Sequence, residues 1–239
     1  MPTKPFIGID LGGTNMQIGV VGPAPEYQLI AQAKRKTRAE EGTEAILGRI
    51  ISGIEEACLA AQLTVADLGG VGIGAPGAVD PVKGVVLEAV NLRWENLPLA
   101  DILSKRLKTS VFLDNDVNVA VYGENKLGAG KDARDLLGVW VGTGIGGGLI
   151  LNGQLYYGHF MTAGEIGHTI LFPGHARGQR SLEHNCSRTA VVDRLVRLIK
   201  ANNKSKITAE VEGDYSVSYT HLRAHETKAN LVCRLLLEK

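Results

Sequence analysis

The segment LLGVWVGTGIGGGLIL (residues 136–151) repeats the plan of FIGIDLGGTNMQIGVV (residues 6–21). In both, an apolar run leads into a loop of glycine and threonine, and a second apolar run follows. Short apolar runs bounded by glycine are typical of strands, so each segment predicts two strands joined by a tight loop. A repeated unit indicates two halves of similar construction, which constrains the fold more than any other feature of the chain.

Glycine-rich loops between strands can bind anions. Successive backbone N–H groups in such a turn form a concave surface, and glycine has no Cβ to keep a phosphate oxygen away. Thr14 and Thr143 would add hydroxyl donors, and Asp10 stands just before the first loop. Strand-like residues follow each loop and no lysine ends it, which excludes the P-loop and the dinucleotide-binding loop. Turn glycines without a ligand are the alternative for one loop alone, but two matching loops favour a phosphate site.

The composition is that of an ordinary globular protein. Of the 239 residues, 44% are hydrophobic and 21% are charged, and the net charge is +1. This balance argues against nucleic-acid or membrane-surface binding, which usually needs a basic excess. No apolar run approaches the roughly 18 residues of a spanning helix, and the N-terminus has no signal-peptide core. Cys58, Cys186 and Cys233 form neither a disulfide framework nor a CxxC pair, so we expect a cytoplasmic enzyme.

Hydrophobic periodicity predicts the other elements. Apolar residues recur at helical spacing in residues 44–61 and 188–202, each with a charged opposite face. Two more helices are expected over residues 100–108 and 118–130. The further expected strands are residues 70–77, 85–90 and 111–114.

Five motifs, IGIDLGGTN, GIGAPG, DND, VGTGIGGG and GEIGH, follow one another in an order and spacing that resemble the ROK family of sugar kinases and sugar-responsive repressors. The resemblance implies an α/β protein with the actin-like ATPase (ribonuclease H-like) fold, in which two α/β domains surround a cleft for a nucleotide and a sugar. It also implies that both glycine loops hold the phosphates of ATP, and that Asp10 orients Mg²⁺ through water, since Mg²⁺ keeps several waters. The implied ATP-binding residues are Asp10, Gly12, Gly13, Thr14, Asn15, Gly142, Thr143, Gly144 and Gly146.

Asp116 is the candidate catalytic residue. It follows an apolar strand and precedes a helix, so its carboxylate is expected at a strand end that faces the cleft. A helix N-cap is the other role that this position favours. The resemblance implies that Asp116 is the general base for the sugar hydroxyl and also contacts the sugar. Asn115 is then implied to bond a sugar hydroxyl, and Asp114 is expected to have a turn or capping role.

Other sugar-binding residues are implied around this base. Glu165 and His168 of GEIGH are three residues apart, which puts them on one face if the segment is helical. Both are implied to contact the sugar, and Glu183 is implied to lie near the anomeric hydroxyl. A surface role for Glu183 and a turn role for His168 are the alternatives. Weaker counterparts in the same pocket are Gly77 and Asn91.

The implied activity is ATP-dependent phosphorylation of the C6 hydroxyl of a hexose, with glucose as the leading substrate. Kinases for fructose, N-acetylglucosamine, N-acetylmannosamine or allose, with ATP or polyphosphate as donor, are alternatives. A repressor is disfavoured because few residues precede the first strand and no basic patch stands out. A non-catalytic sugar-binding protein is the third possibility. We expect no nucleic acid and no membrane as partner, and the resemblance makes a homodimer possible.

Many members of the family carry a structural zinc site with three cysteines after GExGH. The corresponding residues here are Gly174, Ala176 and Ser181, none of which binds zinc as a thiolate, so no zinc is expected.

The end of the chain also departs from the family pattern. Residues 215–239 resemble translated adapter DNA, so we expect a non-native tail there. The expected domains are then residues 1–115, an N-terminal α/β domain with the first phosphate loop, and residues 116–214, a larger C-terminal α/β domain that is truncated.

Overall fold

The first repeat unit forms a β-hairpin, as predicted. The computed structural model of the chain describes residues 4–202. Strands β1 (Phe6–Leu11) and β2 (Asn15–Val21) pair antiparallel. Gly12 closes the turn, because its N–H donates to the carbonyl of Asn15 at 3.0 Å. The loop is therefore shorter than the LGGTN motif, and Asn15 already belongs to β2.

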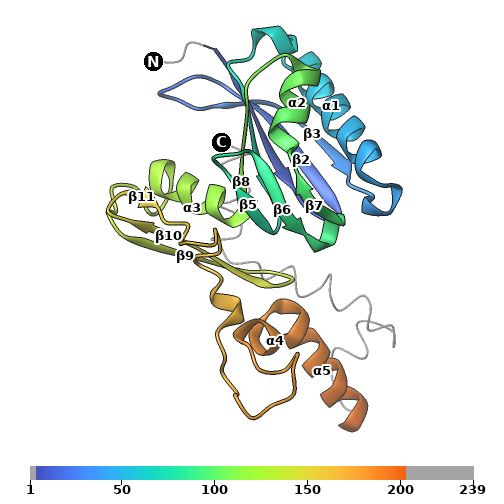
Figure 1. Cartoon of the computed structure of the whole chain (residues 1–239), viewed down its shortest axis with the longest axis vertical. Helices are drawn as coiled ribbons and strands as arrows, with labels where there is room; N and C mark the ends of the chain where they lie inside the picture. Colours follow the sequence, from blue (N-terminus) through green and yellow to red (C-terminus); the bar gives the residue numbers. More distant parts are fainter. Residues whose placement is uncertain (1–3, 203–239) are drawn as a thin grey trace.

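The hairpin belongs to a five-stranded sheet with the order β3-β2-β1-β4-β8. β3 extends the hairpin antiparallel, whereas β4 lies parallel to β1 and β8 lies parallel to β4. Parallel neighbours need a crossover connection, and helices α1 and α2 lie side by side in these connections (Figure 1). The bounds of these elements are β3 Leu29–Lys36, α1 Thr43–Ala60, β4 Val71–Ala75, α2 Leu99–Leu107 and β8 Val111–Asn115.

The main core lies between this sheet and the two helices. Alternate residues of β1, namely Ile7, Ile9 and Leu11, are almost completely buried, as expected for a strand with one covered face. Burial of one such side chain contributes about 1.5–3 kcal/mol, so this face stabilises the first half of the chain. The fully buried side chains of α1 recur at helical spacing and are Ile46, Leu47, Ile50 and Ile54.

A small antiparallel sheet, β5-β6-β7, is inserted between β4 and α2. Its strands are β5 Ala78–Asp80, β6 Val85–Ala89 and β7 Trp94–Leu97. The sequence predicted only β6, because β5 is too short for a periodic pattern and β7 exposes its two middle residues. In the described residues, 3₁₀ turns complete the connections: η1 Ala39–Glu41, η2 Val65–Asp67, η3 Val90–Leu92 and η4 Ile166–His168.

The second repeat unit also forms an antiparallel hairpin, with a shorter loop than the sequence predicted. β9 and β10 pair up to Val141 and Ile145, so the loop holds only residues 142–144. Gly146, which was expected in this loop, lies inside β10 together with the two glycines that follow it. β11 completes a three-stranded sheet. The bounds are β9 Leu136–Val141, β10 Ile145–Leu151 and β11 Gln154–Leu155.

Close packing of a helix explains why β10 contains glycine on the face toward that helix. Helix α3 (Asp116–Leu127) lies against this sheet, and a Cβ at Gly146 would lie 2.7 Å from Cγ2 of Val117. The same helix contacts β4 of the larger sheet, where a Cβ at Gly74 would lie 2.6 Å from Cγ2 of Val119. Carbon atoms do not approach so closely in packed interiors, so glycine at these positions lets both sheets reach α3.

Helices α4 (Leu182–Cys186) and α5 (Arg188–Asn202) end the described part and lie at the opposite end of the long axis from α1 (Figure 1). In the range 4–202, no helix combines the length and the apolar character that crossing a membrane requires. The expected boundary after residue 115 falls where β8 passes into α3, and it stays a prediction. The expected tail, residues 215–239, lies outside the described residues.

Candidate active site

Thr37, the residue after β3, holds the first glycine loop with two hydrogen bonds. Its hydroxyl donates to the carbonyl of Gly12 at 2.6 Å, and its N–H donates to the carbonyl of Thr14 at 2.9 Å. Thr37 is fully buried, so water does not compete for these bonds. Both ends of the loop are therefore fixed, and an anion would meet a preorganised main chain there.

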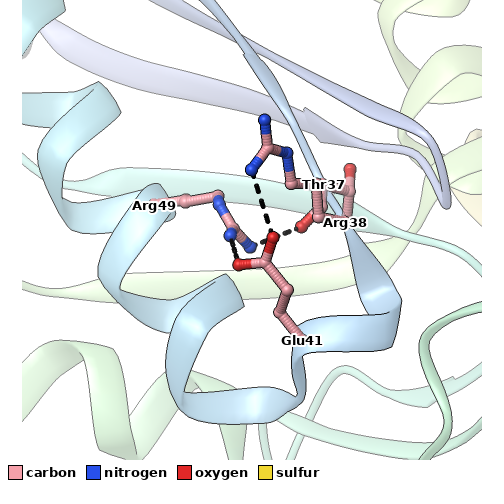
Figure 2. A network of polar contacts seen from close by, with 4 residues as sticks. All are labelled: Thr37, Arg38, Glu41 and Arg49. Carbon is pink, nitrogen blue, oxygen red and sulfur yellow. Dashed lines mark hydrogen bonds and ion pairs between the residues drawn. The ribbon is translucent and has the colours of Figure 1, made fainter.

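A network of charged side chains supports Thr37 (Figure 2). Arg49 of α1 donates to the carbonyl of Thr37 at 2.9 Å and pairs with Glu41. Arg38 also pairs with Glu41, at 3.2 Å. Hydrogen bonds from Arg49 and then Arg38 lower the pKa of Glu41, so this carboxylate stays ionised at neutral pH. Exposed ion pairs stabilise little, so the main effect of the network is to orient Arg49 toward Thr37.

The start of α5 holds the second glycine loop. Within the loop, Gly142 donates to the carbonyl of Gly144 at 2.8 Å. The N–H of Arg188 donates to the carbonyl of Gly142 at 3.0 Å, and its guanidinium donates to the hydroxyl of Thr143 at 3.1 Å. Thr189 donates to the carbonyl of Thr143 at 3.0 Å. Because the Thr143 hydroxyl accepts from Arg188, its own proton is left for another acceptor.

Glu183 of α4 contacts the second glycine loop directly. Its carboxylate accepts a hydrogen bond from the N–H of Ile145 at 2.8 Å. A Cβ at Gly144 would lie 2.3 Å from the same oxygen, so glycine at this position is what admits the carboxylate. Glu183 was expected beside the sugar, and the structure brings it to the loop that was expected to bind phosphate.

Asn115 and Asp116 stand at the junction of β8 and α3. Asn115 is the N-cap of the helix, since its Oδ1 accepts from the N–H groups of Val117 at 2.9 Å and Asn118 at 3.1 Å. Its amide donates to the carbonyl of Gly77 at 3.0 Å. A side-chain amide has two N–H donors, so a second one can serve a sugar hydroxyl. Capping, the alternative considered for Asp116, is thus performed by its neighbour.

Asp116 lines a cavity of 710 Å³ together with Asp10 and Asp114. Most other walls are apolar and include Phe112, Leu113, Val119 and Trp140. Burial raises the pKa of Asp116 to about 6, against a hydrogen bond from the N–H of Val117 and with help from the charges of Asp10 and Glu165. A carboxylate with this pKa is ionised at neutral pH and is still basic enough to accept a proton, which suits a general base.

Glu165 and His168 lie on one side of the single turn η4, as their spacing predicted. The Glu165 carboxylate and Nε2 of His168 are 3.8 Å apart. Their side chains are 48% and 72% exposed, so both are accessible to a ligand. The charge of Glu165 acts on the pKa of Asp116, which places the two carboxylates in the same region.

The two weaker sugar-site candidates lie at different places. Asn91 is beside the first glycine loop, because a Cβ at Gly13 would lie 3.0 Å from its Cβ. Gly77 is beside Asn115 and has φ of +87°, and a Cβ there would lie 2.1 Å from the carbonyl oxygen of Glu88. Gly77 is therefore a position that only glycine fits.

Within the described residues, no group of three or more histidine, cysteine, aspartate or glutamate side chains is arranged to hold a metal ion. Ser181, at the place of the third zinc cysteine, is buried and is the N-cap of α4. The loop before it is closed by the N–H groups of Leu171 and Phe172, which donate to the carbonyl of Arg180. These contacts hold the loop without a metal, and the absence of zinc stays a prediction.

Thr37 and Arg188, which hold the two glycine loops, were not found from the sequence. Neither belongs to a recognisable motif. Sheet register was the missing signal for Thr37, since the preceding Lys36 pairs with Asn15 and brings Thr37 to the loop. A prediction of β3 and of its register with β2 would have placed Thr37 beside the first glycine loop.

The chain is similar to known proteins in sequence. The sequence profile of the ROK family matches residues 6–234. A glucokinase from Halalkalibacterium halodurans is 32% identical over 193 residues, which make up 81% of this chain and 56% of that protein. A xylose repressor from Caldicellulosiruptor bescii is 34% identical over 166 residues, or 70% of this chain and 41% of that protein. The chain thus spans about half the length of the curated relatives it matches.

Among solved structures, a ROK family glucokinase from Streptomyces griseus in complex with glucose and AMPPNP matches with a TM-score of 0.77. The two are 29% identical, and the match covers 95% of this chain and 74% of that chain. This likeness confirms the predicted fold class, an α/β protein with the actin-like ATPase fold.

Proposed function

Because the chain belongs to the ROK family, we propose that it phosphorylates the C6 hydroxyl of a hexose with ATP, with glucose as the leading substrate. The observation that carries this proposal is the position of Asp116, a carboxylate with a pKa of about 6 in a 710 Å³ cavity. Asp10 leads into the first glycine loop and Trp140 into the second, and both line the same cavity. The similarity to glucokinases supports the same assignment.

In the proposed reaction, Asp116 accepts the proton of the C6 hydroxyl. The hydroxyl oxygen forms a bond to the γ-phosphorus while the bond from that phosphorus to the ADP oxygen breaks. The second N–H of the Asn115 amide would bond a neighbouring hydroxyl and hold the sugar in line. Glu165 and His168, exposed on the same turn, would bond further hydroxyls.

The two glycine loops would hold the phosphates from opposite sides. Their backbone N–H groups and the hydroxyls of Thr14 and Thr143 are the donors we assign to this role. Asp10 fits a Mg²⁺ ion, because Mg²⁺ takes few protein carboxylates and completes its shell with water and phosphate. The ion would supply neutralisation of phosphate charge.

We assign Glu183 two contacts, one with the second glycine loop and one with the sugar. One carboxylate oxygen of Glu183 accepts a hydrogen bond from the N–H of Ile145. If the other oxygen bonds the anomeric hydroxyl of the sugar, Glu183 couples the second glycine loop to the sugar pocket. Glu183→Gln keeps the size of the side chain. It should weaken glucose binding directly, and it should weaken ATP binding because Glu183 holds the second glycine loop.

Asp116→Asn tests the catalytic assignment. Without the base, kcat should fall by about 10²–10⁴-fold, while the dissociation constant for glucose stays within about threefold. ADP release over a panel of hexoses and calorimetric glucose titration measure the two effects. Asp101→Asn is the matched control, since Asp101 is exposed and pairs with Lys105 on α2. Near-normal turnover by Asp116→Asn would remove Asp116 as the base.

A sugar-binding protein without kinase activity is the second candidate, and the similarity to a xylose repressor favours it. The two candidates separate in one assay. A sugar sensor binds its sugar with no ADP release in the presence of ATP and Mg²⁺, and a kinase releases ADP only with the right sugar.

A further inference from the structure

One hydrogen bond joins the two segments that carry the proposed sugar-binding residues. The phenol of Tyr157 donates to Oδ2 of Asp114 at 2.6 Å. Asp114 comes directly before Asn115 and Asp116, whereas Tyr157 follows β11 in the segment that leads to Glu165. The partners are 43 positions apart, so the bond exists only in the folded chain.

Asp114 is fixed at its other carboxylate oxygen as well. Oδ1 accepts from the N–H of Asn115 at 2.7 Å and from the side-chain amide of Asn118 at 3.3 Å. Asn118 is buried in the first turn of α3. With partners on both oxygens, Asp114 is a rigid reference point at the start of the helix.

Tyr157 fixes its own segment through the main chain. Its carbonyl accepts from the N–H of Ala163 at 2.9 Å, which closes the loop between them. Gly164 follows at once and packs on β10, where a Cβ on it would lie 2.4 Å from the carbonyl oxygen of Gly147. Glu165 is the next residue, so its position depends on where Tyr157 is held.

The bond has the properties of a strong, permanent contact. Burial, followed by the hydrogen bond to Asp114, raises the pKa of the Tyr157 phenol above its usual value, so the phenol remains a donor. Hydrogen bonds to a charged acceptor are stronger than those between neutral groups.

We propose that the hydrogen bond between Tyr157 and Asp114 is a positioning contact for the hexose. It sets the distance between the GEIGH segment, residues 164–168, and the catalytic turn, residues 114–116, which together would surround the sugar. Tyr157 acts through these residues and is a positioning residue. The inference rests on the proposed function for its ligand, although the contact itself is independent of it.

Tyr157→Phe removes only the hydroxyl. Its matched control is Tyr156→Phe, the same change at the preceding residue, whose side chain is half exposed. For Tyr157→Phe we expect the dissociation constant and KM for glucose to rise about tenfold, with the KM for ATP nearly unchanged and the Tm lowered by the loss of the hydrogen bond. Tyr156→Phe should leave all four values unchanged. Asp114→Asn keeps an oxygen acceptor for the phenol and should have a smaller effect than Tyr157→Phe.

Amide hydrogen exchange of residues 158–168 gives a readout without any ligand. Faster exchange in Tyr157→Phe than in Tyr156→Phe is the expected result. Equal exchange in the two variants, with equal glucose affinity, would overturn the inference. If exchange is faster but the unsubstituted chain binds no hexose, the contact stands and the proposed function is wrong.

Discussion

At the scale of single residues, Asp116 determines how the proposed activity depends on pH. Its pKa of about 6 arises from burial, opposed by the N–H of Val117 and assisted by Asp10 and Glu165. Only the ionised form accepts a proton, so kcat/KM for glucose should fall about tenfold per pH unit below pH 6. A pH profile of initial rates measures the acid limb. A limb near pH 4 would mean that burial does not act on this carboxylate.

The raised pKa of Asp116 also determines how the stability of the folded chain changes with pH. A carboxyl whose folded pKa exceeds its ordinary value of 3.8 favours folding when protonated, and this advantage is lost as the pH rises through about 6. The charge then costs roughly 3 kcal/mol at neutral pH. Asp116→Asn should therefore have a higher Tm than the unsubstituted chain at pH 8, with a smaller difference at pH 5. Thermal unfolding at both values measures this, and a lower Tm at pH 8 would contradict it.

At the scale of elements, the end of β3 supports the first glycine loop. Thr37→Val keeps the shape of the side chain but leaves the Gly12 carbonyl without its hydroxyl donor, which should cost about 1–3 kcal/mol. The KM for ATP should rise more than the KM for glucose, because the loop is assigned to phosphate. Denaturant unfolding and steady-state kinetics measure both effects. Thr37→Ser retains the hydroxyl and should restore most of the loss.

The glycines of β10 give a second test at this scale. A Cβ at Gly148 would lie 2.7 Å from Cγ2 of Val121 in α3, so Gly148→Ala should destabilise by about 1–3 kcal/mol. Adding Val121→Ala makes room, and the double variant should lose less than the sum of the single ones. Gly48→Ala in α1, with open space around it, is the control and should stabilise. Additive losses in the double variant would show that the contact is not tight.

The sequence predicted those elements whose residues carry their own signal. Both hairpins, α1 and the catalytic turn are in place, because strand runs, helical spacing and capping residues are local features. β3 was missed because most of its exposed positions are polar or basic, namely Gln32, Lys34 and Lys36, and only Ala33 is buried. Gly146 of β10 was assigned to a ligand, although its nearest neighbour is Val117 of α3. Contacts distant in sequence, such as those of Thr37 and Tyr157, left no motif to find.

At the scale of the whole molecule, β9 exposes one apolar face. Leu137, Val139 and Val141 alternate along this edge strand and are 52%, 45% and 46% exposed. Adjacent apolar side chains of this kind bind hydrophobic dyes. The folded chain should enhance the fluorescence of anilinonaphthalene sulfonate, and replacing all three by threonine should reduce that enhancement at unchanged Tm. Equal fluorescence from both proteins would show that the dye binds elsewhere.

Helix α3 lies against two sheets with no side chain between its own valines and the glycines that face it. Each sheet therefore approaches α3 closely, and the same helix packs against both sheets. Asp116, the first residue of the helix, is therefore positioned by packing against both sheets.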